Sequence, residues 1–407
     1  MTHDREAWNL RLVLTGAIVL GFSLVCSAGY QPAYTTMIEN GPSANRIDMV
    51  FMGDGYQANQ LQTSYPSHIN AMLNHMFEQG EDPFPRYRNF FNVHRIDLVS
   101  QDSGADVPPE GINVTTALNA SYYYGGSAER LLYIDSGKAQ NAMSAALASA
   151  PFQSEMSLVS VNDSRYGGGG GSFAVYAGGH PRGPEIALHE LGHSFAGLAD
   201  EYGGFRTEYQ GPEPQQANIT RSANGDKWAH WKGYYEPEMG TIGAYEGAGY
   251  YDEGLYRPSK NSKMRSLGRP FDAVGREQII LSIYDFVDPL DAWADNRQSL
   301  VDPETLWVDV IDSEVIDVEW IIDGRCQRQM EGEEVLDLAA LNLEPGLHTI
   351  TAHAFDDTEW VRIDREDLEQ SVSWTVEISG LARVPEPSVV SLLLLGLVPL
   401  LLRRRMA

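Results

Sequence analysis

The sequence predicts a mixed α/β domain over residues 29–300, followed by an all-β sandwich over residues 301–380. Two observations support this division. In the first region, apolar strand patterns alternate with helical apolar spacing, and such alternation is typical of a mixed sheet covered by helices. After Asp288-Pro289 the composition becomes acidic, and short alternating apolar and polar runs replace the helical patterns.

Length and charge limit the classes of partner. With 407 residues the chain can hold two or three domains. It has 56 acidic and 29 basic residues, a net charge of −27 that repels nucleic acid and anionic membranes. Its two cysteines are Cys26, in the leader, and Cys326, so we expect no disulfide within the mature chain.

Residues 1–28 are typical of a signal peptide. Arg5 and Arg11 flank an apolar run that reaches Val25, and small residues follow before Gly29. The alternative is an N-terminal membrane anchor.

The predicted elements of the α/β domain follow in chain order. Strands are expected at 46–53, 90–98, 131–134 and 156–161, and helices at 65–78 and 139–150. Five glycines at 167–171 predict a mobile loop rather than a regular element. We expect the strand at 172–176 to be an edge strand that could pair with an extended substrate, with an ordinary linker and strand as the alternative.

Residues 185–202 contain the pattern HELGH. His189 and His193 are four residues apart, so on a helix both imidazoles face the same side and can bind one zinc ion. Glu190 can reach a zinc-bound water as a general base. Taken alone, the pentapeptide also fits a surface helix with two solvated histidines.

A catalytic zinc requires a third protein ligand. In a continuous helix Asp200 would lie about 10 Å beyond His193, so the chain must turn, and Gly197 permits the turn. A ligand delivered after a glycine turn is the metzincin arrangement, which makes the domain zincin-like, although Gly197 and Asp200 each come one residue late. Asp200 is the first choice for the third ligand and Glu201 the alternative; Met264 is the candidate for a methionine turn beneath the zinc.

The remaining segments are expected to have structural roles. Residues 203–256 are rich in Gly, Tyr and Trp and predict a long, ordered loop region that shapes the cleft wall. A closing helix is expected at 271–287. The short strands at 303–380 suggest an immunoglobulin-like sandwich, with Trp320 and Trp374 in its core and with structural roles for His348 and His353.

Residues 384–407 contain Pro-Glu-Pro, an apolar run and three arginines. This tail resembles the PEP-CTERM sorting signal of Gram-negative bacteria. The resemblance implies transient anchoring in the inner membrane, processing by an exosortase, and a place at the cell surface or in the extracellular matrix. A plain C-terminal membrane anchor is the alternative.

The region from about residue 45 to residue 283 resembles the IgA-peptidase-like bacterial metallopeptidases. The segments FMGDGY, FFNVHRIDLVSQDSGAD and HELGHSFAGLADEY carry the resemblance, and the late Asp is a feature of that family. It implies a zinc endopeptidase with His189, His193 and Asp200 as ligands and Glu190 as base. Ser262 and Lys263 precede Met264 where the family often has cysteines.

These observations predict an exported zinc metalloendopeptidase that acts on proteins or peptides. Tyr202 and Tyr256 are candidates to stabilise the oxyanion. Two alternatives remain open: an inactive surface or matrix binding protein, and a zinc amidase acting on cell-envelope amides.

Overall fold

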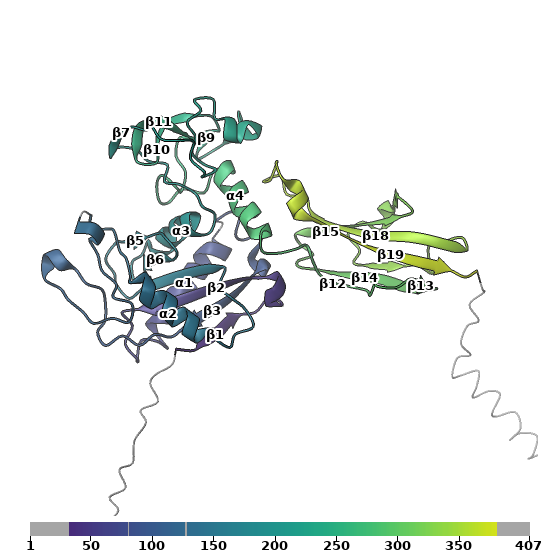
Figure 1. Cartoon of the computed structure of the whole chain (residues 1–407), viewed down its shortest axis with the longest axis horizontal. Coiled ribbons are helices and arrows are strands. Elements are labelled where there is room, and N and C mark those ends of the chain that lie inside the picture. Colours follow the sequence, from purple (N-terminus) through teal and green to yellow (C-terminus); the bar gives the residue numbers. More distant parts are fainter. Residues whose placement is uncertain (1–31, 80, 127, 381–407) are drawn as a thin grey trace, which may run out of the picture. The chain divides into compact units, whose positions relative to one another are not determined.

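The structure is a computed structural model that describes residues 32–79, 81–126 and 128–380 (Figure 1). The predicted signal peptide at 1–28 and the predicted transmembrane sorting tail at 384–407 lie outside these residues. Across the described ranges, no helix has the length and apolar character needed to cross a membrane.

A six-stranded mixed sheet forms the centre of the first region. Its strands have the order β1-β3-β2-β4-β6-β5. Strands β2, β3, β4 and β6 are parallel, and β1 and β5 are antiparallel to their neighbours. The bounds are β1 Tyr34–Ile38, β2 Ile47–Asp54, β3 Phe91–Ile96, β4 Met156–Val161, β5 Gly168–Gly169 and β6 Ala174–Ala177. The predicted strand at 131–134 forms only isolated bridges, to Gly168 and Ser121.

Both faces of this sheet are buried, which explains why β2 is apolar along most of its length. Met49 and Phe51 point into one core with α1 (Ser64–Glu78), α3 (Gly183–Ser194) and α4 (Ala273–Tyr284). Val50 and Met52 point into a second core with α2 (Ser136–Ala146). Alternation of side chains along a strand produces this division.

The glycine-rich and aromatic region after α3 contains more regular structure than we expected. Strands β10 (Tyr245–Ala248), β11 (Tyr251–Arg257) and β7 (Arg206–Glu208) form a small sheet, and β8 (Tyr235–Glu236) pairs with β9 (Gly240–Thr241). The prediction of a loop throughout was therefore wrong. Gly249, with a positive φ, forms the turn between β10 and β11, and the strands of this region are too short to give a clear period.

The C-terminal region is formed by two sheets, with strand orders β12-β14-β17 and β13-β19-β18-β15-β16. Trp320 and Trp374 are buried and stacked, with ring centroids 5.8 Å apart, as expected for core residues. The bounds are β12 Leu290–Trp293, β13 Leu300–Val301, β14 Thr305–Val310, β15 Ile316–Ile322, β16 Arg325–Cys326, β17 Val335–Asp337, β18 Gly346–Asp356 and β19 Glu369–Ile378.

The two expected structural histidines of this region pair with acidic side chains. His348 Nδ1 lies 2.7 Å from Asp323 Oδ2, and His353 Nε2 lies 3.2 Å from Glu369 Oε2.

Candidate metal centre

Helix α3 holds the HELGH residues with one face in the core. Ile186, Ala187, Leu188 and Leu191 are all buried. The helix ends at Ser194, and Gly197 has a φ of +61°. The Leu198 amide then donates to the Gly192 carbonyl at 2.8 Å. The turn predicted at Gly197 is confirmed, and it returns the chain toward the helix.

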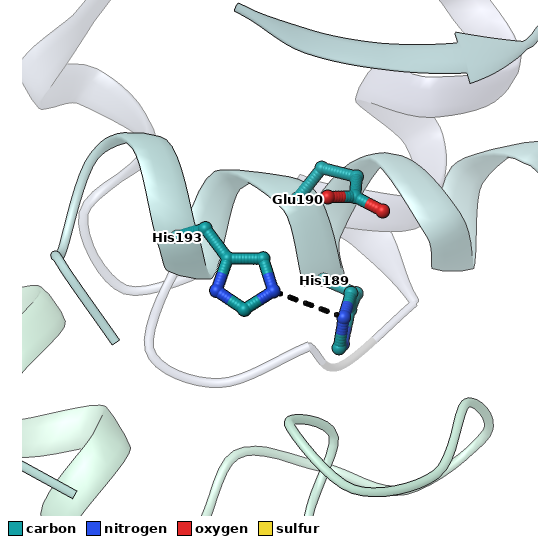
Figure 2. Close-up of side chains that lie close together, drawn as sticks. All are labelled: His189, Glu190 and His193. Carbon is teal, nitrogen blue, oxygen red and sulfur yellow. Dashed lines mark hydrogen bonds between the residues drawn. The ribbon is translucent and has the colours of Figure 1, made fainter. Parts of the chain in front are cut away.

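His189 and His193 point from one side of α3 toward the same place (Figure 2). Their Nε2 atoms are 3.2 Å apart, and the two rings are nearly perpendicular, at 88°. Each Nδ1 lies near a backbone carbonyl: His189 at 3.0 Å from Lys263 O, and His193 at 2.7 Å from Leu198 O. A carbonyl can only accept, so each Nδ1 donates a hydrogen bond to its carbonyl, and Nε2 is the ring atom that faces the shared place and could bind a metal ion.

Asp200 completes a triangle of atoms with the two histidines. Its Oδ1 lies 3.2 Å from His189 Nε2 and 3.4 Å from His193 Nε2. This oxygen is buried, and among the described residues no group donates a hydrogen bond to it within ordinary geometry. Asp200 Oδ2 accepts a hydrogen bond from Tyr250 Oη.

The donor set fits a zinc ion. Two imidazole Nε2 atoms and one carboxylate oxygen converge here, and such a group requires a metal cation or a proton among its members. Zinc binds nitrogen and oxygen at about 2.0–2.2 Å in a tetrahedron, which places neighbouring ligand atoms about 3.3–3.6 Å apart. The observed separations are 3.2, 3.2 and 3.4 Å, close to the lower end of that range.

The charges of the site also favour a cation. Burial raises the pKa of Asp200, but the two histidines outweigh burial and hold that pKa well below its usual value. Burial lowers the pKa of His193, but Asp200 and Glu190 outweigh it and raise the pKa to about 9. The carboxylate therefore stays ionised and attracts positive charge to the three atoms.

Glu201, the alternative third ligand, points elsewhere. Its carboxylate accepts from Ser262 Oγ at 2.7 Å and from Asn218 Nδ2 at 3.0 Å. Its side chain is buried, and burial raises its pKa well above the usual value. Of the two adjacent acidic residues, the structure brings only Asp200 to the histidines.

Glu190 lies beside the triangle. A carboxylate oxygen of Glu190 and one ring nitrogen each of His189 and His193 all lie within 4.8 Å of one another. Burial raises the pKa of Glu190, and the two histidines oppose that shift. The carboxylate can therefore take and return a proton at the edge of the site.

The site opens into a cleft with two adjoining hollows, of about 340 and 250 Å³. Both are lined by Arg130, Gly168, His189, Glu190 and Tyr202, so they adjoin at the histidine and the glutamate. The larger extends toward Arg182 and Arg265, and the smaller toward Tyr133 and Tyr250.

The glycine run forms part of this cleft and part of the sheet. Gly168 and Gly169 make the two-residue strand β5, and β6 lies between β5 and β4. The predictions of a mobile loop at 167–171 and of an edge strand at 172–176 were therefore wrong. A Cβ at Gly168 would lie 2.3 Å from Ile186 Cγ2, and one at Gly170 would lie 2.9 Å from Glu190 Oε2. Glycine is required here because the backbone approaches α3 closely.

Met264 lies beneath the HELGH helix. It is buried, and a Cβ added to Gly192 would lie 2.6 Å from its sulfur. Ser262 and Lys263 brace this turn: Ser262 bonds to Glu201, and the carbonyl of Lys263 holds His189. Polar contacts thus hold the turn at the positions where the family often has cysteines.

A second group of acidic residues and histidine supports the same turn. His75 Nε2 lies 3.1 Å from both Glu81 Oε1 and Glu185 Oε1. The fully buried Lys263 ammonium lies 3.2 Å from Glu81 and 2.8 Å from Glu185. Lysine already supplies the cation that these carboxylates need, so the group acts as an ion-pair cluster that fixes Lys263.

The cluster predicts a pH-dependent stability. Glu185 and Glu81 raise the pKa of His75 from 6.5 to about 9. The folded state then holds a proton that the unfolded chain loses, so this stabilisation is complete below pH 6.5 and is lost as the pH rises to about 9. After allowance for solvent screening, we expect His75→Gln to lower the free energy of unfolding by about 1–2 kcal/mol at pH 6 and by little at pH 9.5. Urea titrations at both values measure this; an equal loss at both would contradict it.

Several residues of the cleft were missed by sequence reasoning. Tyr250 reaches Asp200 because the Gly249 and Tyr250 amides donate to the carbonyls of Asp200 and Tyr202. Arg130 and Tyr133 come from a segment far from α3 in sequence. Of the two predicted tyrosines, Tyr202 lines the cleft, whereas Tyr256 lies in β11 and does not line it.

Comparison with solved structures adds little about the site. Eight chains match, among them the Bacteroides ovatus mixed-linkage glucan utilization locus SGBP-B in complex with a mixed-linkage heptasaccharide. That protein is 12% identical, with a TM-score of 0.17 and 22% of this chain covered. The chain spans 23% of the length of that protein. No curated protein matches the chain.

Comparison with protein families is informative. The model of the IgA Peptidase M64 family matches residues 35–241, just over half of the 407 residues. The match includes the central sheet, α3 and Asp200, and it agrees with the resemblance seen in the sequence. The chain belongs to the IgA Peptidase M64 family.

Proposed function

We propose that this protein is an exported zinc metalloendopeptidase with His189, His193 and Asp200 as metal ligands and Glu190 as general base. Membership of a metallopeptidase family supports hydrolysis of peptide bonds. One observation carries the zinc assignment: two imidazole nitrogens and one buried carboxylate oxygen converge 3.2–3.4 Å apart, and no other group of the described residues donates to that oxygen.

The residues of the site have separate roles in the proposed hydrolysis. Zinc would supply a Lewis acid that polarises water and the scissile carbonyl. Glu190 accepts a proton from the attacking water and later gives it to the leaving amine nitrogen. Lys263 and Leu198 hold the histidine rings through their carbonyls, which fixes both tautomers. Tyr202 lines both hollows, and we assign to it the donation of a hydrogen bond to the developing oxyanion.

The shape of the cleft supports internal cleavage of a chain. The two hollows adjoin at His189 and Glu190, so a peptide can extend away from the scissile bond in both directions. Casein, a peptidoglycan-derived amide and a polysaccharide amide, tested side by side, distinguish the alternatives. We expect casein alone to be cut. Cleavage of only the amides would indicate a zinc amidase, and binding without any cleavage would indicate an inactive binding protein.

The organisation of the whole chain is also a proposal. We propose a zincin-like domain at 29–300, an immunoglobulin-like sandwich at 301–380, a signal peptide at 1–28 and a PEP-CTERM sorting tail at 384–407. In this account an exosortase processes the tail, and the enzyme acts at the cell surface or in the extracellular matrix of a Gram-negative bacterium.

Tyr250 is expected to position Asp200. Its hydroxyl donates to Asp200 Oδ2, which leaves Oδ1 directed at the histidines. We expect Tyr250→Phe to weaken zinc binding by about 10–100-fold, because loss of a contact behind a ligand has effects of this size. Competition with a calibrated zinc chelator measures the change. Tyr245→Phe, whose hydroxyl donates to Thr241 O, is the matched control. Equal zinc affinities in both variants would contradict the role.

A further inference from the structure

We propose that the larger hollow of the cleft binds an acidic side chain of the substrate, Asp or Glu, close to the scissile bond. This inference rests on the proposed peptidase function and adds a preference among peptides.

The first observation is the concentration of arginine. Arg130, Arg182 and Arg265 all line the hollow of about 340 Å³ that contains His189 and Glu190. All three side chains are exposed. The chain as a whole carries a net charge of −27. Positive side chains gathered in one hollow of an acidic protein create a local positive electrostatic potential. That potential attracts negatively charged groups of a substrate to the hollow.

The second observation is that, in the described part of the chain, these arginines are not held in ion pairs, although Arg130 interacts with the Tyr202 side chain. Within residues 32–79, 81–126 and 128–380, none of the three arginines forms an ion pair with a carboxylate. Arg265 donates one hydrogen bond, to the carbonyl of Lys260 at 2.8 Å. By contrast, Arg165 binds both Glu110 and Glu129, and Arg276 binds Glu236. The guanidinium groups of the hollow therefore keep donors for a ligand.

The third observation concerns the acidic residues near the hollow. Arg130 interacts electrostatically with Asp200 and Glu190, so Arg182 and Arg265 are the charges most available to a ligand. Among the described residues, Glu190 is the one acidic residue that lines the hollow, and it is assigned to proton transfer. Lys263 also lines it, but the Lys263 ammonium is already neutralised by Glu81 and Glu185. Arg182 directly precedes α3, where the partial positive charge of the helix N-terminus adds to the field.

These features fit a carboxylate better than other groups. Arginine presents several N–H donors in one plane and binds carboxylates through paired hydrogen bonds. The cleft continues past His189 into the second hollow, so the carboxylate belongs to a side chain within the peptide rather than to its C-terminus.

The test uses the zinc-loaded full chain and C-terminally amidated synthetic peptides. The peptides form pairs that differ only in Glu or Gln at one position, and the position is moved along the peptide. At one position beside the cut, we expect kcat/KM for the Glu peptide to exceed that for the Gln peptide about tenfold, the size of one charge-assisted hydrogen bond. We expect the ratio to fall as salt rises from 50 to 500 mM.

Substitution of the arginines tests whether the preference for Glu arises in the larger hollow. We expect Arg182→Gln and Arg265→Gln each to lower the Glu/Gln ratio, and the double variant to bring it near one. Arg325→Gln, an exposed arginine of β16, removes the same charge elsewhere and should keep the wild-type ratio. A ratio near one in the wild type, a ratio unchanged in the double variant, or removal of single C-terminal residues only would overturn the proposal.

A binding measurement separates this proposal from the peptidase assignment. Zinc-loaded Glu190→Gln should bind the Glu peptide with about tenfold lower Kd than the Gln peptide, as measured by fluorescence anisotropy. If the wild type cuts nothing but this preference is found, the peptidase assignment fails and the acidic subsite stands. If the wild type cuts both peptides equally and the variant binds both equally, the subsite fails and the peptidase assignment stands.

Discussion

Glu190→Gln should lower the rate of casein cleavage by about 10²–10⁴-fold, the usual contribution of a general base. Glutamine has nearly the shape of glutamate but cannot accept the proton of the attacking water. Glu190 is not one of the three atoms that form the triangle, so zinc content should stay at that of the wild type. Loss of activity with retained metal is the expected pattern.

The measurement compares initial rates and zinc per chain on the same preparations. Gln278→Glu adds one negative charge on α4, away from the cleft. It shows whether a change of one charge alone alters the rate. If Glu190→Gln cuts casein as fast as the wild type, Glu190 is not the base. If it loses zinc, Glu190 has a metal-binding role that the geometry does not assign to it.

Asp200→Ala should abolish zinc binding, whereas Glu201→Gln should keep it. Asp200 Oδ1 is the oxygen that faces both Nε2 atoms, at 3.2 and 3.4 Å. Its removal leaves two ligands, fewer than a catalytic zinc site requires. Glu201 is occupied by Ser262 and Asn218, and its amide analogue can keep one hydrogen bond to each.

Zinc content after dialysis against a weak chelator distinguishes the two variants, and thermal unfolding of each shows whether the fold persists. His193→Ala provides the reference for complete loss of metal. If Asp200→Ala kept zinc and Glu201→Gln lost it, Glu201 would be the third ligand. That result would contradict the geometry described for this site.

The parts of the site that are local in sequence could be predicted. The HELGH spacing fixes two imidazoles on one side of α3, and the distance from His193 to Asp200 requires a turn. Glycine at 197 supplies that turn with a φ of +61°. The sequence alone could not show whether Asp200 or Glu201 is the third ligand. The two side chains are adjacent in the chain and point in different directions. The hydrogen bond from Ser262 to Glu201 turns the Glu201 side chain away from the histidines.

The parts that depend on contacts between distant segments could not be predicted. Glycine is rare in strands, yet Gly168 and Gly169 form β5 because a side chain there would clash with Ile186 and Leu132. Tyr250 approaches Asp200 through backbone bonds between segments that have no common pattern. The three arginines of the hollow come from three separate segments, and no spacing rule links them.

Zinc titration of casein cleavage tests the central claim most directly. The protein is stripped with a chelator, freed of it, and assayed after stepwise addition of zinc. We expect no cleavage without metal, a linear rise in rate, and a plateau at one zinc per chain. Full cleavage by the stripped protein, or none at any zinc content, would contradict the assignment of a zinc peptidase.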